Sequence, residues 1–410
     1  MGILKSWAIG LLALITGLAL FVTVSVISSN FDTELTQNDL QPFYTPPSSL
    51  EGSPRDLLRV ESLSVDVDGA ESLRILYLTE LDNGDLAAAS GMAFIPTSPA
   101  TSEPRPIVAW THGTVGEGDA CAPSRQKDPT SQLTQFLPSM IQLGWALVAT
   151  DYTGLGTPGV QAYLLKDQEV RDTVNSVRAL QQIPQANVGS RYTVIGHSQG
   201  GHTALWTGHL SKKFAPELEL LGVAAAAPAA ELTQILGKQW DTVVSWVIGA
   251  EVMRSWPLQY PNLPTNEILT RSGQKNYDRL ARECIKDAAF EAEIRSNAFN
   301  EQFFSSNPSE DPAWVAALNE QTPPPFPTDM PLLLIQGTAD KIVLPQPNAY
   351  LQKTWCEAGT KISALWLGGV GHVAAAAIAG PTAVSWMKEI FAGTTPTSSC
   401  GGPIPMLPPL

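Results

Sequence analysis

Short runs of apolar residues alternate with segments of helical periodicity along most of this 410-residue chain. Residues 73–78 and 90–96 form the first two runs, and the sequence Asp82-Asn83-Gly84 between them predicts a turn. Further apolar runs lie at residues 107–110, 146–150, 192–195, 223–227, 331–335 and 363–367. Helical patterns separate these runs at residues 130–143, around Val170, Val174 and Val177, and at residues 199–213. Buried strands that alternate with helices are typical of an α/β fold with a mostly parallel central sheet flanked by helices.

One long segment interrupts this alternation. Residues 229–328 show helical patterns and turn signals without a convincing core strand, and they hold Trp240, Trp246, Trp256, Phe303, Phe304 and Trp314. We expect this segment to form a helical cap or lid inserted into a core made of residues 30–228 and 329–400. Residues 30–60 are polar and Pro-rich, which predicts an extended arm, and residues 401–410 form a Pro-rich tail.

The first 29 residues have the character of an export segment. Trp7 to Ile27 is an uncharged, mostly apolar run, and the single charge of Lys5 precedes it. The run exceeds the roughly 7–15 apolar residues of a signal peptide and reaches the length that spans a bilayer. We therefore expect residues 1–29 to be a cleaved signal peptide or a retained membrane anchor, with the rest of the chain outside the cytoplasm, either secreted, periplasmic or anchored.

Composition narrows the possible partners. The chain is 44% hydrophobic and 16% charged, which excludes wholesale disorder, and its net charge of −14 argues against nucleic acid as a partner. There are four cysteines and no Cys-x-x-Cys pair, so a zinc site is not expected. An even number of cysteines in an exported chain predicts two disulfides, for which three pairings are possible.

The sequence Gly196-His197-Ser198-Gln199-Gly200 carries the main chemical signal. A Gly-x-Ser-x-Gly motif alone is weak, but here an apolar run at residues 193–195 leads into it and a helical pattern follows it. A tight strand-to-helix turn needs small residues on both sides of the serine, and it lifts the hydroxyl to the carboxyl edge of the sheet. The pattern therefore predicts that Ser198 is a nucleophile.

A serine hydroxyl needs a base before it can attack a substrate. His197 and His202 adjoin Ser198, but their side chains are expected to point away from the hydroxyl, at the turn and along the following helix. His112 follows an early strand and suits a structural or oxyanion-binding role. His372 follows the last predicted strand in a glycine-rich loop, so it can reach the carboxyl edge of the sheet and is the predicted base.

The predicted acid is Asp340. It follows the buried strand at residues 331–335, and it lies between Ser198 and His372 in the chain, which is the order found in α/β hydrolases. Asp329 lies at the opposite end of that strand. An aspartate at position 340 also suits a turn, but its place after a buried strand favours the role of orienting the base.

The oxyanion hole requires two backbone N–H groups. One is expected from Gln199, the residue after the nucleophile and the first of a helix. Two loops that follow apolar strands compete for the other, His112-Gly113-Thr114 and residues 151–154.

These motifs together resemble the secretory lipase family, the yeast lipase A type, within the α/β-hydrolase fold. The matching segments are residues 43–47, 110–114, 151–156, 196–201, 337–340 and 371–372. The resemblance implies hydrolysis of carboxylic esters, often triacylglycerols, and a helical cap before the strand that carries the acid. It also implies that Asp151 joins Gln199 in the oxyanion hole, and that the disulfides are Cys121–Cys284 and Cys356–Cys400.

The sequence therefore predicts an exported serine hydrolase, a triacylglycerol lipase or carboxylesterase that works through an acyl-enzyme on Ser198. Its partner is a small-molecule or lipid ester, with a lipid interface as a further partner, and neither a metal nor an organic cofactor is required. A serine peptidase of the prolyl oligopeptidase kind shares the triad order, although no propeller is visible in the sequence. A non-catalytic binding domain on the same fold is the other alternative, and the presence of every triad candidate argues against it.

Overall fold

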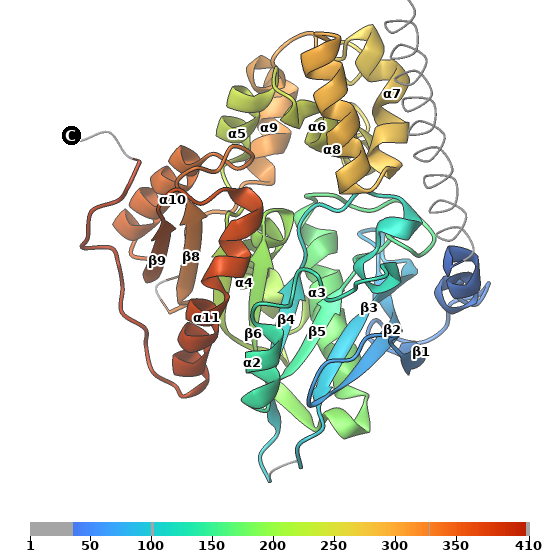
Figure 1. Ribbon diagram of the computed structural model, residues 1–410, viewed down its shortest axis with the longest axis vertical. Helices are drawn as coiled ribbons and strands as arrows, with labels where there is room; N and C mark the ends of the chain where they lie inside the picture. The colour runs from blue at the N-terminus through green and yellow to red at the C-terminus, as the bar shows by residue number, and fades with distance from the viewer. Residues whose placement is uncertain (1–35, 100–101, 328, 407–410) are drawn as a thin grey trace, which may run out of the picture. The chain divides into compact units, whose positions relative to one another are not determined.

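The computed structural model describes residues 36–99, 102–327 and 329–406 (Figure 1). The expected signal peptide or anchor lies outside these residues. Within the described ranges, no helix combines the length and the apolar character needed to cross a membrane.

The chain divides into two units after Thr45. In the first unit, residues 36–44 are helical, so the prediction of an extended arm is wrong there. Leu40, Phe43 and Tyr44 recur at the i, i+3, i+4 spacing of an amphipathic helix, a signal that the nearby prolines obscured.

A mixed sheet forms the centre of the second unit. Within the described residues it has nine strands in the order β1-β2-β3-β5-β4-β6-β7-β8-β9. The pairs β1–β2, β2–β3 and β3–β5 are antiparallel, and the remaining pairs of neighbouring strands are parallel. The strands are β1 Leu57–Ser62, β2 Ala70–Glu80, β3 Leu86–Pro96, β4 Arg105–Thr111, β5 Ala146–Thr150, β6 Val188–His197, β7 Glu219–Ala226, β8 Leu332–Gly337 and β9 Ile362–Leu367. The mostly parallel sheet predicted from the sequence is confirmed.

Strand β1 was not predicted, because it lies within the segment expected to be an extended arm. It is the edge strand beside β2, and its residues are half-buried or exposed. An edge strand of this kind lacks the continuous apolar run that marks the central strands.

Helices cover both faces of the sheet (Figure 1). Consecutive strand residues such as Val108 and Ala109 pack into different cores, as the alternation of side chains along a strand requires. One core contains side chains of α3 Lys166–Gln181, α4 Gln199–Phe214 and α10 Pro345–Glu357, and the other contains side chains of α2 Leu137–Gln142 and α11 His372–Phe391. Helix α2 is shorter than the predicted range 130–143, whose first half forms turns.

The segment between β7 and β8 carries a separate helical layer with its own aromatic core. It contains α5 Leu232–Gln239, α6 Val244–Ser255, α7 Arg271–Arg282, α8 Ile285–Glu293 and α9 Pro312–Glu320. Figure 1 shows these helices grouped beyond one end of the sheet. Trp246, Trp256, Trp314 and Phe303 are buried among them, and we call this layer the cap.

Candidate active site

Ser198 occupies a sharp turn between β6 and α4. Its backbone has φ 58° and ψ −117°, a conformation that residues other than glycine rarely adopt. A Cβ atom on Gly196 would lie 2.0 Å from the Gly200 carbonyl oxygen, and one on Gly200 would lie 1.9 Å from the Thr111 carbonyl oxygen. The turn therefore needs glycine at both positions, because the strand and the helix cross in contact.

Three side chains from distant parts of the chain meet at this turn. His372 Nε2 lies 2.9 Å from Ser198 Oγ, and His372 Nδ1 lies 2.8 Å from Asp340 Oδ2. All three residues are at least nine-tenths buried. Both ring nitrogens of the histidine are thus engaged, one with a hydroxyl and the other with a carboxylate, which is the arrangement of a serine hydrolase triad.

Asp340 lies in the turn that follows β8. Its Oδ1 accepts hydrogen bonds from the backbone N–H groups of Ile342 at 2.9 Å and Val343 at 3.0 Å. Its Oδ2, which faces His372, also accepts a hydrogen bond from Gln336 Nε2 at 3.2 Å. These donors fix the orientation of the carboxylate.

His372 is the first residue of helix α11, with Gly371 as its N-cap, whereas the sequence suggested a loop position. The alanine-rich stretch after His372 has high helix propensity, so the helix begins immediately. The predicted base is therefore held on a rigid element.

The remaining histidines beside the motif have other contacts. His197 Nε2 lies 3.0 Å from the backbone oxygen of His372, to which it donates a hydrogen bond, and burial together with the nearby His372 lowers the pKa of His197 to about 3. His202 is fully buried, so it does not follow the helix surface as expected. Its Nε2 lies 2.7 Å from the Gln321 carbonyl oxygen in the cap. His197 is therefore neutral at ordinary pH, and His202 faces the cap.

The two loops that competed for the second oxyanion donor differ in the structure. The Asp151 N–H already donates to the Ser90 carbonyl oxygen at 2.8 Å, and its buried carboxylate accepts hydrogen bonds from Ser90 and Ser124. This corrects the assignment of Asp151 to the oxyanion hole, because its donor is used within the sheet.

The His112-Gly113-Thr114 loop lies against the nucleophile instead. A Cβ atom built on Gly113 would lie 3.3 Å from Ser198 Cβ. His112 is buried, and its ring nitrogens face the Gly113 carbonyl oxygen at 2.7 Å and the Asp151 carbonyl oxygen at 3.2 Å. Gln199 is the first residue of α4, so its N–H has no acceptor in a preceding helical turn.

Comparison with known proteins assigns the family. A model of the secretory lipase family matches residues 129–399. The chain belongs to the secretory lipase family. Lipase A of Moesziomyces aphidis is 22% identical over 393 residues, which cover 89% of this chain and 83% of that protein. A secreted triacylglycerol lipase of Malassezia globosa is 24% identical over 362 residues, covering 80% of this chain and 75% of that protein.

The fold agrees with this assignment. The structure of Candida antarctica lipase A in its closed state matches with a TM-score of 0.70 at 19% identity, covering 90% of this chain and 89% of that one. This secretory lipase is thus a carboxylic ester hydrolase with an α/β-hydrolase fold, and the resemblance inferred from the sequence motifs is confirmed.

In this secretory lipase, a pocket lined mostly by apolar side chains reaches Ser198. Its core side is formed by Ser198, Gln199, Tyr163 and Leu164. Its cap side is formed by Ile235, Ile248, Val252, Trp256, Phe304 and Trp314. The surface beside the nucleophile therefore suits an apolar chain better than a charged one.

Two disulfides occur, Cys121–Cys284 and Cys356–Cys400, which are the pairs that the resemblance implied. The first joins the loop after β4 to the N-cap of cap helix α8. Backbone hydrogen bonds from Ile285 N–H to the Val115 carbonyl and from Glu117 N–H to the Ala281 carbonyl lie beside it. The cap is thus fixed covalently to the loop that continues from the His112-Gly113-Thr114 segment.

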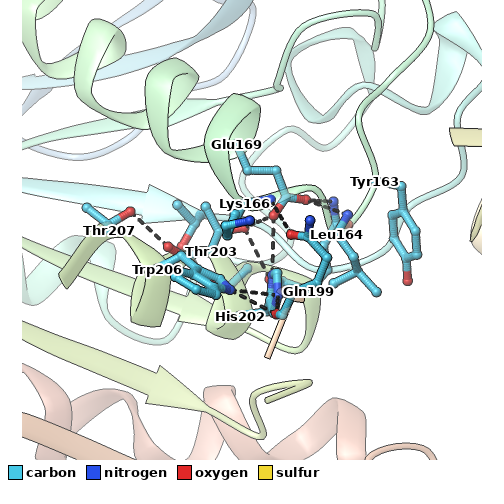
Figure 2. Close-up of polar contacts among 12 residues, drawn as sticks. Tyr163, Leu164, Lys166, Glu169, Gln199, His202, Thr203, Trp206 and Thr207 are labelled. Atoms are coloured by element: carbon cyan, nitrogen blue, oxygen red, sulfur yellow. Dashed lines mark hydrogen bonds and ion pairs between the residues drawn. The ribbon is translucent and has the colours of Figure 1, made fainter. Parts of the chain in front are cut away.

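One buried carboxylate near the nucleophile was missed in the sequence. Glu169, in the first turn of α3, accepts a hydrogen bond from Gln199 Nε2 at 2.7 Å (Figure 2). Its local sequence resembles any acidic start of a helix, so only the fold could bring it to this position.

Proposed function

We propose that this protein is an exported lipase or carboxylesterase that hydrolyses esters of apolar acyl groups through Ser198, His372 and Asp340. The observation that carries the proposal is the pair of contacts made by His372, 2.9 Å to the Ser198 hydroxyl and 2.8 Å to the Asp340 carboxylate. Family membership favours ester hydrolysis over the peptidase alternative.

In the acylation step, Ser198 Oγ attacks the ester carbonyl carbon while His372 Nε2 takes the hydroxyl proton. Asp340 holds Nδ1–H, so that Nε2 presents its lone pair to the hydroxyl, and it stabilises the imidazolium that forms. When the tetrahedral intermediate collapses, the C–O bond to the alcohol breaks and His372 returns the proton to the leaving alcohol. The acyl group stays on Ser198.

In the deacylation step, His372 takes a proton from water, and the water oxygen attacks the acyl carbonyl. Collapse of the second intermediate releases the fatty acid and returns the proton to Ser198 Oγ. In both steps the Gln199 N–H, at the start of α4, donates to the oxyanion. The second donor belongs to the His112-Gly113-Thr114 loop, which lies against Ser198.

The pocket supports an acyl substrate with an apolar chain. Its cap side is built of aliphatic and aromatic side chains, which stabilise a hydrocarbon chain by burial. The relative from Malassezia globosa is named a secreted triacylglycerol lipase, and its name supports both export and a triacylglycerol substrate for this chain.

Hydrolysis of p-nitrophenyl esters by the Ser198→Ala variant tests the triad. We expect the rate to fall by about 10⁶-fold or to the uncatalysed level, because the nucleophile is lost. Retained hydrolysis would show that another residue attacks the substrate. A series of esters from acetyl to palmitoyl, measured with and without an emulsion, tests the substrate class, and activity restricted to the shortest acyl groups would rule out a lipase.

A further inference from the structure

Glu169 is a buried carboxylate that the mechanism above does not use. It is 1% exposed. Its Oε1 accepts hydrogen bonds from Gln199 Nε2 at 2.7 Å and from the Leu164 N–H at 3.0 Å, and its Oε2 accepts one from Thr203 Oγ1 at 2.6 Å (Figure 2). Removing a carboxylate from water is costly unless donors replace the water, so three converging donors indicate a specific arrangement.

His202 faces the same carboxylate. Its Nδ1 lies 3.5 Å from Glu169 Oε2, and its Nε2 lies 2.7 Å from the Gln321 carbonyl oxygen and 3.2 Å from Trp206 Nε1. Gln321 is the C-cap residue of cap helix α9. A chain of contacts therefore runs from the cap through His202 to Glu169 and then to Gln199.

We propose that Glu169 is a positioning residue for the oxyanion hole. Gln199, His202 and Thr203 all belong to the first five residues of α4, and one carboxylate faces all three side chains. These contacts hold the turn, and with it the Gln199 N–H, in the orientation that receives the oxyanion. Donors that are fixed before the reaction stabilise the transition state without reorganisation. The inference rests on the proposed function, since it assigns a role at the same site.

A purely structural role for Glu169 predicts a different kinetic effect. Leu164 lines the substrate pocket, and its N–H is also held by Glu169. If Glu169 only anchored this wall, its loss would raise KM for long acyl chains. If it positions the Gln199 N–H, its loss lowers kcat for short and long acyl chains alike.

The test compares Glu169→Ala, Gln199→Ala, the double variant and Glu169→Gln on p-nitrophenyl butyrate and palmitate. We expect kcat to fall about ten- to hundredfold in each alanine variant with KM changed little, a smaller loss than that of an oxyanion donor itself. The losses in the double variant should be less than the product of the two single losses, because Glu169 acts partly through Gln199. Glu169→Gln should recover most of kcat, since its amide can accept from Gln199 Nε2 and donate to Thr203 Oγ1.

Asp172→Ala is the matched control. Asp172 is a fully buried carboxylate on the same helix α3, and it accepts hydrogen bonds from the Thr153 N–H at 2.8 Å and Thr79 Oγ1 at 2.9 Å, away from α4. Its loss should lower the melting temperature and leave kcat unchanged.

Three results would overturn the inference: wild-type kcat in Glu169→Ala, wild-type kcat in Gln199→Ala, or multiplying losses in the double variant. If Glu169→Ala does not fold, the other two variants test the inference. Gln199→Ala must then have a lowered kcat, and Glu169→Gln must have a kcat close to that of the wild type. Ser198→Ala, measured in the same series, tests the proposed function separately, since its retained activity would refute the triad and not merely the role of Glu169.

Discussion

His197 and His372 are adjacent rings whose hydrogen bonds give them different chemistry. Their centroids lie 4.6 Å apart, but only His372 contacts both the hydroxyl and the carboxylate. The pKa of His197 is lowered to about 3 by burial and by its neighbour, so its ring stays neutral at ordinary pH. We therefore expect the pH dependence of kcat/KM near neutrality to persist in His197→Gln if that variant folds.

Asp340→Asn tests the carboxylate of the triad. The amide can no longer stabilise the imidazolium and favours the wrong tautomer of His372, so kcat should fall by about 10³–10⁴-fold while the fold is kept. Stopped-flow or steady-state measurement of ester hydrolysis gives the loss of kcat. Asp329→Asn, an exposed aspartate before the same strand, is the matched control and should keep the wild-type rate. A mild effect of Asp340→Asn would assign the acid elsewhere.

Glu251 makes stability depend on pH. It is fully buried on α6, and both burial and the nearby Glu117 carboxylate raise its pKa well above the usual value. Burial also raises the pKa of Glu117 to about 8, although the Ser255 hydroxyl and the Arg254 guanidinium, whose Nε lies 2.8 Å from Glu117 Oε2, oppose the rise.

The direction of this pH dependence follows from the number of protons bound in the folded and unfolded states. Above the ordinary pKa of 4.5, the folded state holds a proton on Glu251 that the unfolded state has lost. The free energy of unfolding therefore falls as pH rises, by up to about 1.4 kcal/mol per pH unit, until the folded pKa is passed. Glu251→Gln should make this fall shallower in denaturant unfolding above about pH 5, because of this pair only Glu117 then still binds a proton in the folded state. The exposed variant Glu389→Gln should leave it unchanged, and an equally steep fall in Glu251→Gln would refute the assignment.

At the scale of elements, the crossing of β6 and α4 decides the geometry of the site. Gly200 has no space for a side chain, since its Cβ would lie 1.9 Å from the Thr111 carbonyl oxygen. Gly200→Ala must push α4 away from the end of β4 and thereby shift its crossing with β6, so we expect loss of several kcal/mol of stability and of at least about 100-fold in kcat. Gly368→Ala is the control, because nothing lies within 4 Å of a Cβ at that position. Near-normal activity of Gly200→Ala would contradict this account of the turn.

Strands could be predicted from the sequence where their burial requires a continuous apolar run. The strands β4, β5 and β8 are buried along most of their length and β6 and β7 in their second parts, and each carries such a run. The half-exposed edge strand β1 and the helix at residues 36–44 lack that signal among their prolines and polar residues. The start of α11 at His372 depends on helix propensity, which the glycines before it concealed.

At the scale of the whole molecule, the order of motifs along the chain predicts candidates for the nucleophile, acid and base. This is possible because the carboxyl ends of the parallel strands lie at one edge of the sheet. Individual hydrogen bonds between groups far apart in the chain could not be predicted in this way. The Asp151 N–H is used by Ser90, and Glu169 reaches Gln199 across 30 residues. Such pairs depend on strand order and helix packing, which no local pattern encodes.

The two disulfides should differ in their effects, because they close different parts of the molecule. Cys121–Cys284 spans 163 residues and Cys356–Cys400 spans 44. Chain entropy alone predicts losses of roughly 5 and roughly 4 kcal/mol when each is replaced by a serine pair.

The first bridge also joins the cap to the loop that continues from the His112-Gly113-Thr114 segment beside Ser198. Removing it should therefore lower kcat as well as the free energy of unfolding, whereas removing the second, which holds the C-terminal segment to α10, should affect stability alone. Denaturant unfolding and ester hydrolysis of Cys121→Ser/Cys284→Ser and Cys356→Ser/Cys400→Ser measure both quantities. Equal kinetic effects of the two pairs would show that the cap is not what keeps this loop against the nucleophile.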